Sequence, residues 1–485
     1  MLVQVKEEVS RGHSSCRYEP CDTRKSHKAA KDQTLSCSKC CMEACQPCIK
    51  RNRENRKVNK MSEQVINRRN MHLAYKQVLA NKGSAGVDGM QVSELKAHIR
   101  KEREAIVLSI INDRYLPQPI LGVSIPKGNG KTRLPGIPTV TDRWLQQAVA
   151  QTITPLFEFE FKDHSYGFRP NKNAHQCIQQ SQQYINDGDN HIVDIDLKSF
   201  FDEVDHRLLL QLLYNKVKCP IILRLIRKWL RVPILINGKL TKRRKGVPQG
   251  SPLSPLLSNI MLHELDKEME QQGLKYVRYA DDFSIYCKSN HAARKTGNKV
   301  FLYLKNKLKL PINGEKSGIR KPVQFTILGH RYVPTYKKGT KGKYQLVVAD
   351  KSWDKLKQSL KTITRKTSAS SVAERIQKLK EVGRGWLNYF RMASITGKLK
   401  DLDSWIRNRL RYCIWTDWKK PERRRKKPFE IGGRPATCLW MEQNTNGWMG
   451  SSAKPDNDNN CYTGTTKETR IRSYALLLLQ SISTT

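Results

Sequence analysis

The sequence is poor in acidic side chains and has no long apolar run. Its 485 residues include 44 Asp and Glu against 89 Lys and Arg, which gives a net charge of +45. Such a charge repels itself in a compact chain, so a polyanion is the expected partner; the alternative is a generally basic, hydrated surface. No stretch of about 18 apolar residues occurs, which excludes a membrane-spanning helix, and the first residues lack the apolar core of a secretory signal.

Internal repeats and a disulfide framework are also missing. No period of 20–50 residues recurs, which excludes a repeat array. Of the 13 cysteines, seven precede residue 50 and six are scattered singly, a usage typical of a reducing cytosol. The early group includes two CxxC pairs with only four residues between them, shorter than the usual zinc-finger loop, at Cys37, Cys40, Cys45 and Cys48. We therefore expect a disordered, basic leader over residues 1–60, rather than a zinc site, with Met61 as an alternative start.

Two short segments carry acids at positions that suit a metal site. In HIVDIDLKSFFDEVDH (191–206), strand periodicity places Asp194 and Asp196 on one face. In LKYVRYADDFSIYCK (274–288), Asp281 and Asp282 sit at a tight turn between two short strands. If the segments are neighbours in one sheet, Asp196 and Asp281 converge with Asp282 beside them. Clustered carboxylates repel unless a cation neutralises them, and oxygen ligands suit Mg²⁺. The alternative is that the paired acids merely cap a hairpin turn.

A third segment favours the metal site over the turn cap. KGVPQGSPLSPLLSNIMLHELDKEM (245–269) is a Gly/Pro/Ser loop that runs into a helix with an apolar face. Gly250 allows close backbone approach to a nucleotide. The loop lies between the two acidic segments, where an incoming base pair would sit in a nucleotidyl-transfer enzyme.

The order DLKSFFD, QGSPLSPLLSN and YADD resembles the reverse transcriptases, and most of all the group II intron-encoded reverse transcriptase/maturase family of bacterial type. Five further segments match this family: IPKGNGKTRLPGIPTVTDRWLQQAV (125–149), SYGFRP (165–170), NGEKS (313–317), FTILGHRY (325–332) and GWLNYFR (385–391). The resemblance covers roughly residues 61–420. It implies an α+β right-hand polymerase fold, with fingers and the start of the palm over 61–190, palm over 191–345 and a helical thumb/maturase domain over 346–420.

The resemblance assigns catalytic roles to the acids. Asp196, Asp281 and Asp282 would hold two catalytic Mg²⁺ ions, which Mn²⁺ could replace, with Asp196 and Asp281 as the more direct ligands. The backbone carbonyl of Leu197 would be a further ligand. Asp194 is interpreted as a structural acid.

The resemblance also implies nucleotide contacts. Phe201 would lie under the sugar of the incoming nucleotide and clash with a 2′-OH, which favours deoxynucleotides; the alternative is a core position. Lys127 and Arg133 would clamp the triphosphate. Gln249 and Gly250 would contact the nascent pair, and Lys316 would be a proton donor for pyrophosphate. Arg169 either contacts template or braces the fingers.

The expected function is RNA-directed DNA polymerisation with assistance to intron splicing and mobility. The implied partners are structured intron RNA, an RNA template with a DNA or RNA primer, dNTPs and target DNA, in a cytoplasmic, nucleoid-associated bacterial ribonucleoprotein. The alternatives are a defence-associated or retron-type reverse transcriptase, and a non-catalytic RNA-binding splicing factor. The basic, polar tail over 421–485 has two cysteines and no histidine, so we expect a reduced DNA-binding segment and no His-Asn-His endonuclease.

Overall fold

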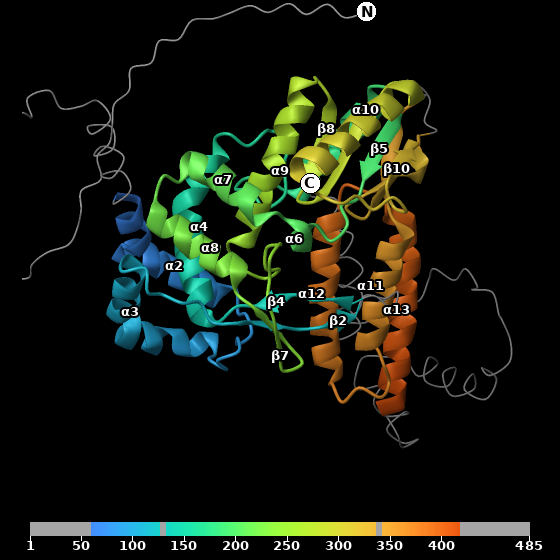
Figure 1. Ribbon diagram of the computed structural model, residues 1–485. Coiled ribbons are helices and arrows are strands. Elements are labelled where there is room, and N and C mark those ends of the chain that lie inside the picture. The colour runs from blue at the N-terminus through green and yellow to red at the C-terminus, as the bar shows by residue number, and fades with distance from the viewer. Residues whose placement is uncertain (1–59, 127–131, 336–341, 418–485) are drawn as a thin grey trace, which may run out of the picture. The chain divides into compact units, whose positions relative to one another are not determined.

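Three segments of the chain are described by the computed structural model: residues 60–126, 132–335 and 342–417, all within the unit Glu54–Thr485 (Figure 1). The two CxxC pairs, Lys127 and the tail lie outside the described residues. None of the helices in the described segments has the length and apolarity of a membrane span.

A central four-stranded antiparallel sheet joins the two acidic segments. Its strand order is β10-β5-β9-β8, with the bounds Gly318–Arg320, His191–Ile195, Asp282–Cys287 and Lys275–Tyr279. β5 therefore lies beside β9, so the two acidic segments are neighbours in one sheet, which is the condition for their acids to converge. The register pairs Ile195 with Phe283, and Tyr279 with Asp282 across the hairpin turn.

Both faces of the central sheet are covered, and strand periodicity decides which residues face which side. On one face Val193 and Ile195 pack into a core that includes α10 (Asn290–Tyr303). On the other face Ile192 and Val277 pack into a second core with α5 (Ala174–Asn186). Two-sided burial leaves the functional positions at the end of β5 and in the β8–β9 turn, where the apolar alternation stops.

A helical subregion is formed by chain segments that come before β5 and between β5 and β8 in the sequence. Its helices are α2 (Arg68–Ala80), α3 (Leu95–Ile111), α4 (Val140–Glu158), α7 (His206–Lys216) and α8 (Pro220–Arg231). A small sheet of order β4-β1-β6-β7 (Gly136–Ile137, Ile120–Gly122, Ile234–Ile236, Lys239–Thr241) and a ribbon of β2 (Ile125–Pro126) and β3 (Thr132–Arg133) complete it. Helix α9 (Ser254–Gln271) packs on α4, α7 and β8.

One buried carboxylate ties this helical subregion together. Asp142, near the start of α4, accepts hydrogen bonds from Tyr115, Trp229 and Thr139 at 2.8, 2.8 and 2.9 Å. Burial raises the pKa of Asp142, and these donors oppose the rise. The acid is satisfied by partners far apart in sequence, so it fixes how α8 and the segment before β1 pack on α4.

The C-terminal part of the described chain is a bundle of α11 (Asp350–Ile363), α12 (Val372–Phe390) and α13 (Thr396–Asp417), drawn in orange in Figure 1. A sheet of order β11-β12-β13 (Thr326–Ile327, His330–Pro334, Tyr344–Val348) leads into it. Each helix contributes buried apolar side chains to the core, including Trp353, Leu379 and Ile406.

An aromatic seam joins this bundle to the β12 sheet. Trp386 lies 4.7 Å from Trp353 and 4.6 Å from Phe390, measured between ring centroids. The Tyr389 hydroxyl donates to the Leu328 carbonyl at 3.0 Å. Phe390 is therefore buried and Trp386 is partly buried in this seam, whereas the Tyr389 ring stays 36% exposed at its edge.

His330 of β12 is fully buried in this seam and makes the junction sensitive to acid. Its ring lies 4.8 Å from that of Phe390, and its Nε2 has no hydrogen-bond partner among the described residues. Burial lowers the pKa of His330 to about 4 from its usual 6.5. The unfolded chain therefore binds the proton more readily than the native protein does. As the pH decreases from 6.5 to 4, this group lowers the free energy of unfolding.

Replacing His330 by Phe should therefore flatten the acid side of the stability profile. Between pH 7 and pH 5, wild type should lose about 2 kcal/mol more free energy of unfolding than His330→Phe. Urea unfolding at both pH values measures this difference. Equal losses in the two proteins would show that His330 is not the titrating group.

Candidate active site

The register of the central sheet brings Asp196 and Asp282 to the same cleft. Asp196 follows the last residue of β5, and Asp282 is the first residue of the neighbouring β9. The cleft has a volume of about 470 Å³ and is lined by Asp194, Asp196, Asp282, Glu315, Lys316 and Arg320, among others. Asp281 precedes Asp282 in the turn, but it is not among the described residues that line this cleft.

Two cations in and just before β10 pair with the two acids at the end of β5. Lys316 Nζ lies 2.9 Å from Asp196 Oδ2, and Arg320 Nε lies 2.9 Å from Asp194 Oδ2. Arg320 also donates to the Lys316 carbonyl at 2.6 Å. Asp196 itself is anchored through its backbone N–H, which donates to Ser317 Oγ at 3.0 Å. Lys316 therefore lies at the acidic cleft in contact with Asp196, and its role as a proton donor for pyrophosphate stays a prediction.

The cleft carries an excess of negative charge. The pKa of Asp282 is raised to about 6, first by desolvation within the cleft and then by the charges of Asp281, Asp196 and Asp194. The hydrogen bond to Asp196 raises the pKa of Lys316. Carboxylates that oppose each other's ionisation are stabilised by a cation, so this electrostatic state fits a divalent ion.

The donor set fits an ion whose coordination the substrate completes. Within the described segments, no group of three or more His, Cys, Asp or Glu forms a ready metal cage. Mg²⁺ is usually held by one or two carboxylates together with substrate phosphates and water, and Asp196 and Asp282 supply that number at the cleft. An ion there would have to displace the Lys316 ammonium from Asp196.

The β8–β9 turn is strained and closely packed. Ala280 has a φ of +58°, a backbone conformation that residues other than Gly rarely adopt. Gly167 packs against it so closely that an added Cβ would come within 2.2 Å of the Ala280 nitrogen. Glycine at position 167 of the SYGFRP segment is therefore needed to let that backbone approach the turn that carries Asp281 and Asp282.

A fully buried ion pair supports the same turn. Arg278 donates from Nε and Nη2 to the two oxygens of Asp266, at 2.8 and 2.5 Å, and both side chains are inaccessible to solvent. Arg278 Nη1 also donates to the Ala280 carbonyl at 2.9 Å and to Asn259 Oδ1 at 3.1 Å. Asn259 then donates to the Gly167 carbonyl at 2.9 Å. Sequence reasoning missed this network, although an arginine between Val277 and Tyr279 in an apolar strand was a signal.

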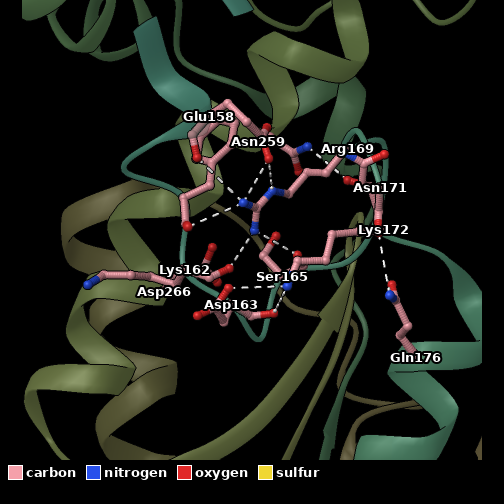
Figure 2. Close-up of polar contacts among 12 residues, drawn as sticks. Glu158, Lys162, Asp163, Ser165, Arg169, Asn171, Lys172, Gln176, Asn259 and Asp266 are labelled. Atoms are coloured by element: carbon pink, nitrogen blue, oxygen red, sulfur yellow. Dashed lines mark hydrogen bonds and ion pairs between the residues drawn. The ribbon is translucent and has the colours of Figure 1, made fainter. Parts of the chain in front are cut away.

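Arg169 braces the fold instead of facing open solvent. Figure 2 shows its guanidinium among Glu158, Lys162 and Ser165. It pairs with the Glu158 carboxylate at 2.8 Å and donates to the carbonyls of Lys162 and Ser165 at 2.6 and 2.9 Å. Its side chain is 5% exposed, which favours the bracing alternative of the sequence prediction.

Three of the predicted nucleotide contacts line a second cavity. Phe201, Gln249 and Gly250 line a pocket of about 370 Å³ that does not include the described acids of the first cleft. The loop before α9 is fixed there, since the Gln249 carbonyl accepts a hydrogen bond from Gly136 N at 2.8 Å. Gly250 has a φ of +107°, and a Cβ would come within 2.7 Å of the Gly136 carbonyl oxygen.

The remaining predicted contacts are placed only in part. Leu197 is buried and forms an antiparallel bridge with Ile312. The backbone of Arg133 pairs with Ile125 in the β2–β3 ribbon.

Comparison with known proteins defines the class to which this fold and cleft belong. The family model "Reverse transcriptase (RNA-dependent DNA polymerase)" matches residues 125–332, and "Group II intron, maturase-specific domain" matches residues 353–429. The central sheet with its acidic cleft thus falls in the first match, and the helical bundle in the second. The architecture is that of a right-hand polymerase, an RNA-directed DNA polymerase class whose members use divalent metal ions and nucleic-acid partners.

Two relatives extend this result. Protein YkfC of Escherichia coli K12 is 31% identical over 53% of this chain and 78% of its own length. The group II intron-encoded protein LtrA of Lactococcus lactis subsp. cremoris is 36% identical over 43% of this chain and 34% of its own length. The chain belongs to the group II intron-encoded reverse transcriptase/maturase family. A solved structure of a "Partial Cas6-RT-Cas1--Cas2 complex" is 24% identical over 51% of this chain and 42% of its own length, with a TM-score of 0.33.

Proposed function

We propose that the protein extends a DNA or RNA primer on an RNA template with dNTPs, by nucleotidyl transfer at the cleft between Asp196 and Asp282. The observation that carries this proposal is the convergence of these carboxylates at the ends of paired strands, with the pKa of Asp282 raised to about 6. Two Mg²⁺ ions, or Mn²⁺ in their place, would activate the primer hydroxyl and stabilise the leaving pyrophosphate when bound.

The chain's own groups would divide the remaining tasks. Asp196, Asp281 and Asp282 would hold the ions, with the Leu197 carbonyl as a further ligand. Lys316 lies 2.9 Å from Asp196 and would donate its proton to the departing pyrophosphate. Lys127 and Arg133 clamp the triphosphate, and Gln249 and Gly250 support the new base pair.

We assign the fingers and the start of the palm to residues 61–190, the palm to 191–345 and the thumb/maturase domain to 346–420. The tail over 421–485 would be a reduced DNA-binding segment. The chain spans about a third of the length of LtrA, so splicing assistance and mobility are proposed from the maturase-specific match and the net charge of +45. That charge suits a cytoplasmic bacterial ribonucleoprotein with intron RNA and target DNA as partners.

Phe201 supplies a test of DNA synthesis as opposed to RNA synthesis. Its ring lines the second cavity and packs edge-on against Phe200 at 5.3 Å. Phe201→Val should remove the clash with a ribose 2′-OH and raise incorporation of rNTPs relative to dNTPs by roughly 10- to 200-fold. Primer extension on an RNA template with each nucleotide class measures this ratio.

Phe301→Val is the matched control, because Phe301 is 45% exposed on α10 and lies outside that cavity. The ratio of rNTP to dNTP incorporation in this variant should equal that of wild type. An unchanged ratio in Phe201→Val would return Phe201 to the core alternative. Absence of any dNTP incorporation by wild type would reject the proposed polymerase.

A further inference from the structure

Two acids and two cations alternate along the acidic cleft at the end of β5. Asp194 and Asp196 lie two residues apart, and both line the cleft. Arg320, the last residue of β10, pairs with Asp194 at 2.9 Å, and Lys316 pairs with Asp196 at 2.9 Å. The proposed reaction uses Asp196 and Lys316, but it has so far given no task to the pair of Asp194 and Arg320.

The Lys316 loop, residues 311–317, is attached to the end of β5 through its backbone. The Asn313 N–H donates to the Asp196 carbonyl at 2.8 Å, and the Asp196 N–H donates to Ser317 Oγ at 3.0 Å. Within the loop, the Ser317 N–H donates to the Asn313 carbonyl at 2.9 Å. These bonds fix the turn on both sides of Lys316, and the carbonyl of Lys316 itself is held by a different partner.

That partner is Arg320. Its Nη2 donates to the Lys316 carbonyl at 2.6 Å, while its Nε donates to Asp194 Oδ2 at 2.9 Å. A guanidinium is planar and presents its donors in a fixed fork, so two acceptors that it binds at once are held at a set distance from each other. The Asp194 carboxylate is therefore linked, through one rigid group, to the main chain from which the Lys316 side chain starts.

This link matters because the lysine side chain cannot position itself. Its ammonium is a compact charge on a flexible four-carbon stem, so the place of the main chain decides what the charge can reach. The contact between Lys316 and Asp196 would be given up to a metal ion at the cleft. The bond from Arg320 to the Lys316 carbonyl depends on Asp194 instead, so it can persist when that contact is lost.

We propose that Arg320, held by Asp194, is a positioning residue that fixes the main chain at Lys316 so that its ammonium can reach the departing pyrophosphate. As the primer oxygen bonds to the α-phosphorus, the bond from that phosphorus to the bridging oxygen breaks. The bridging oxygen keeps the electron pair and takes a proton from Lys316 Nζ, and the resulting amine regains a proton from water. This inference rests on the proposed function and gives Asp194 a part in the reaction through Arg320.

The test compares single-turnover incorporation by the full-length protein on an RNA template with a DNA primer. Besides normal dNTPs, it uses analogues in which CF₂ or CH₂ replaces the β,γ-bridging oxygen, because the CF₂ leaving group is more acidic and needs a proton less. Arg320→Met should lower the maximal rate with normal dNTPs roughly 10- to 100-fold, with the half-saturating dNTP concentration changed far less. It should also raise the ratio of the CF₂ rate to the CH₂ rate.

Two further variants separate positioning from charge and from folding. Arg320→Lys keeps the positive charge but cannot hold Asp194 and the Lys316 carbonyl at once, so it should be about as slow as Arg320→Met. It also decides the question if Arg320→Met is poorly folded. In a Lys316→Leu background, Arg320→Met should cause no further loss, because the group that it positions is gone.

Arg331→Met is the matched control. Arg331 is 36% exposed, against 35% for Arg320, and it pairs with Asp350 outside the residues that line the cleft. Its rate and its CF₂ to CH₂ ratio should equal those of wild type. A wild-type rate in Arg320→Lys, a loss with an unchanged ratio, or a loss that adds in full to that of Lys316→Leu would overturn the inference while leaving the polymerase intact. Failure of wild type to extend primers would instead reject the proposed function.

Discussion

Asp281→Asn and Asp282→Asn should each lose at least about a thousand-fold in dNTP incorporation while still binding RNA. Asn keeps the shape of Asp but removes a negative charge and a metal ligand, and metal-bound stabilisation of developing charge is worth several kcal/mol. The charge of Asp281 helps to raise the pKa of Asp282 to about 6, so the two acids act on the same site. Single-nucleotide primer extension and filter binding of RNA measure the two properties separately.

The control for this loss is an acid of the same region outside the cleft. Asp187, the exposed residue that follows the last residue of α5, should tolerate Asn with no change in incorporation. Asp194→Asn should give an intermediate loss, because Asp194 lines the cleft but is paired with Arg320. Incorporation near the wild-type rate in the Asp281 and Asp282 variants would remove the metal site from the mechanism.

The second large effect is expected in stability. Asp266→Leu should destabilise the protein by about 3–5 kcal/mol, because it leaves the fully buried Arg278 guanidinium without its counter-charge. Arg278→Met should destabilise the protein by a similar amount, because it leaves the buried Asp266 carboxylate without its counter-charge. The double variant Asp266→Leu with Arg278→Met should be more stable than either single variant, since two apolar side chains of similar size leave no buried charge. Urea unfolding of the four proteins gives the coupling energy.

The ion pair also holds the turn of the active site, so the double variant separates stability from function. Arg278 Nη1 donates to the Ala280 carbonyl, and through Asn259 it is linked to the Gly167 backbone. Loss of these bonds should leave incorporation impaired even where stability is regained. A matched control is Lys267→Met, which removes the partly exposed pair with Glu264 and should cost less than about 1 kcal/mol. Single variants that are as stable as this control would contradict the buried-pair argument.

Local pattern was sufficient to predict the strands and acids of the central sheet. The alternation of Val193 and Ile195 with Asp194 placed the acids on one face, and two apolar segments around Asp281 and Asp282 predicted a hairpin. Both follow from the two-residue period of strands, which is a property of the sequence alone. The apolar stripes of the C-terminal helices were predictable for the same kind of reason.

The parts that could not be predicted depend on partners far apart in the chain. Lys316 pairs with Asp196, and Arg278 with Asp266 and Asn259, through contacts that no local period encodes. The division of the predicted site residues between two cavities likewise depends on how the loop before α9 packs against Gly136.

The most direct test is anomalous diffraction from Mn²⁺ in crystals of the protein with an RNA template, a DNA primer and a dNTP that cannot be transferred. Strong peaks should lie between the carboxylates of Asp196 and Asp281 or Asp282, with Lys316 withdrawn from the 2.9 Å contact with Asp196. Mn²⁺ bound elsewhere, with the Lys316–Asp196 pair intact and the dNTP phosphates away from the cleft, would show that these acids do not form a nucleotidyl-transfer site.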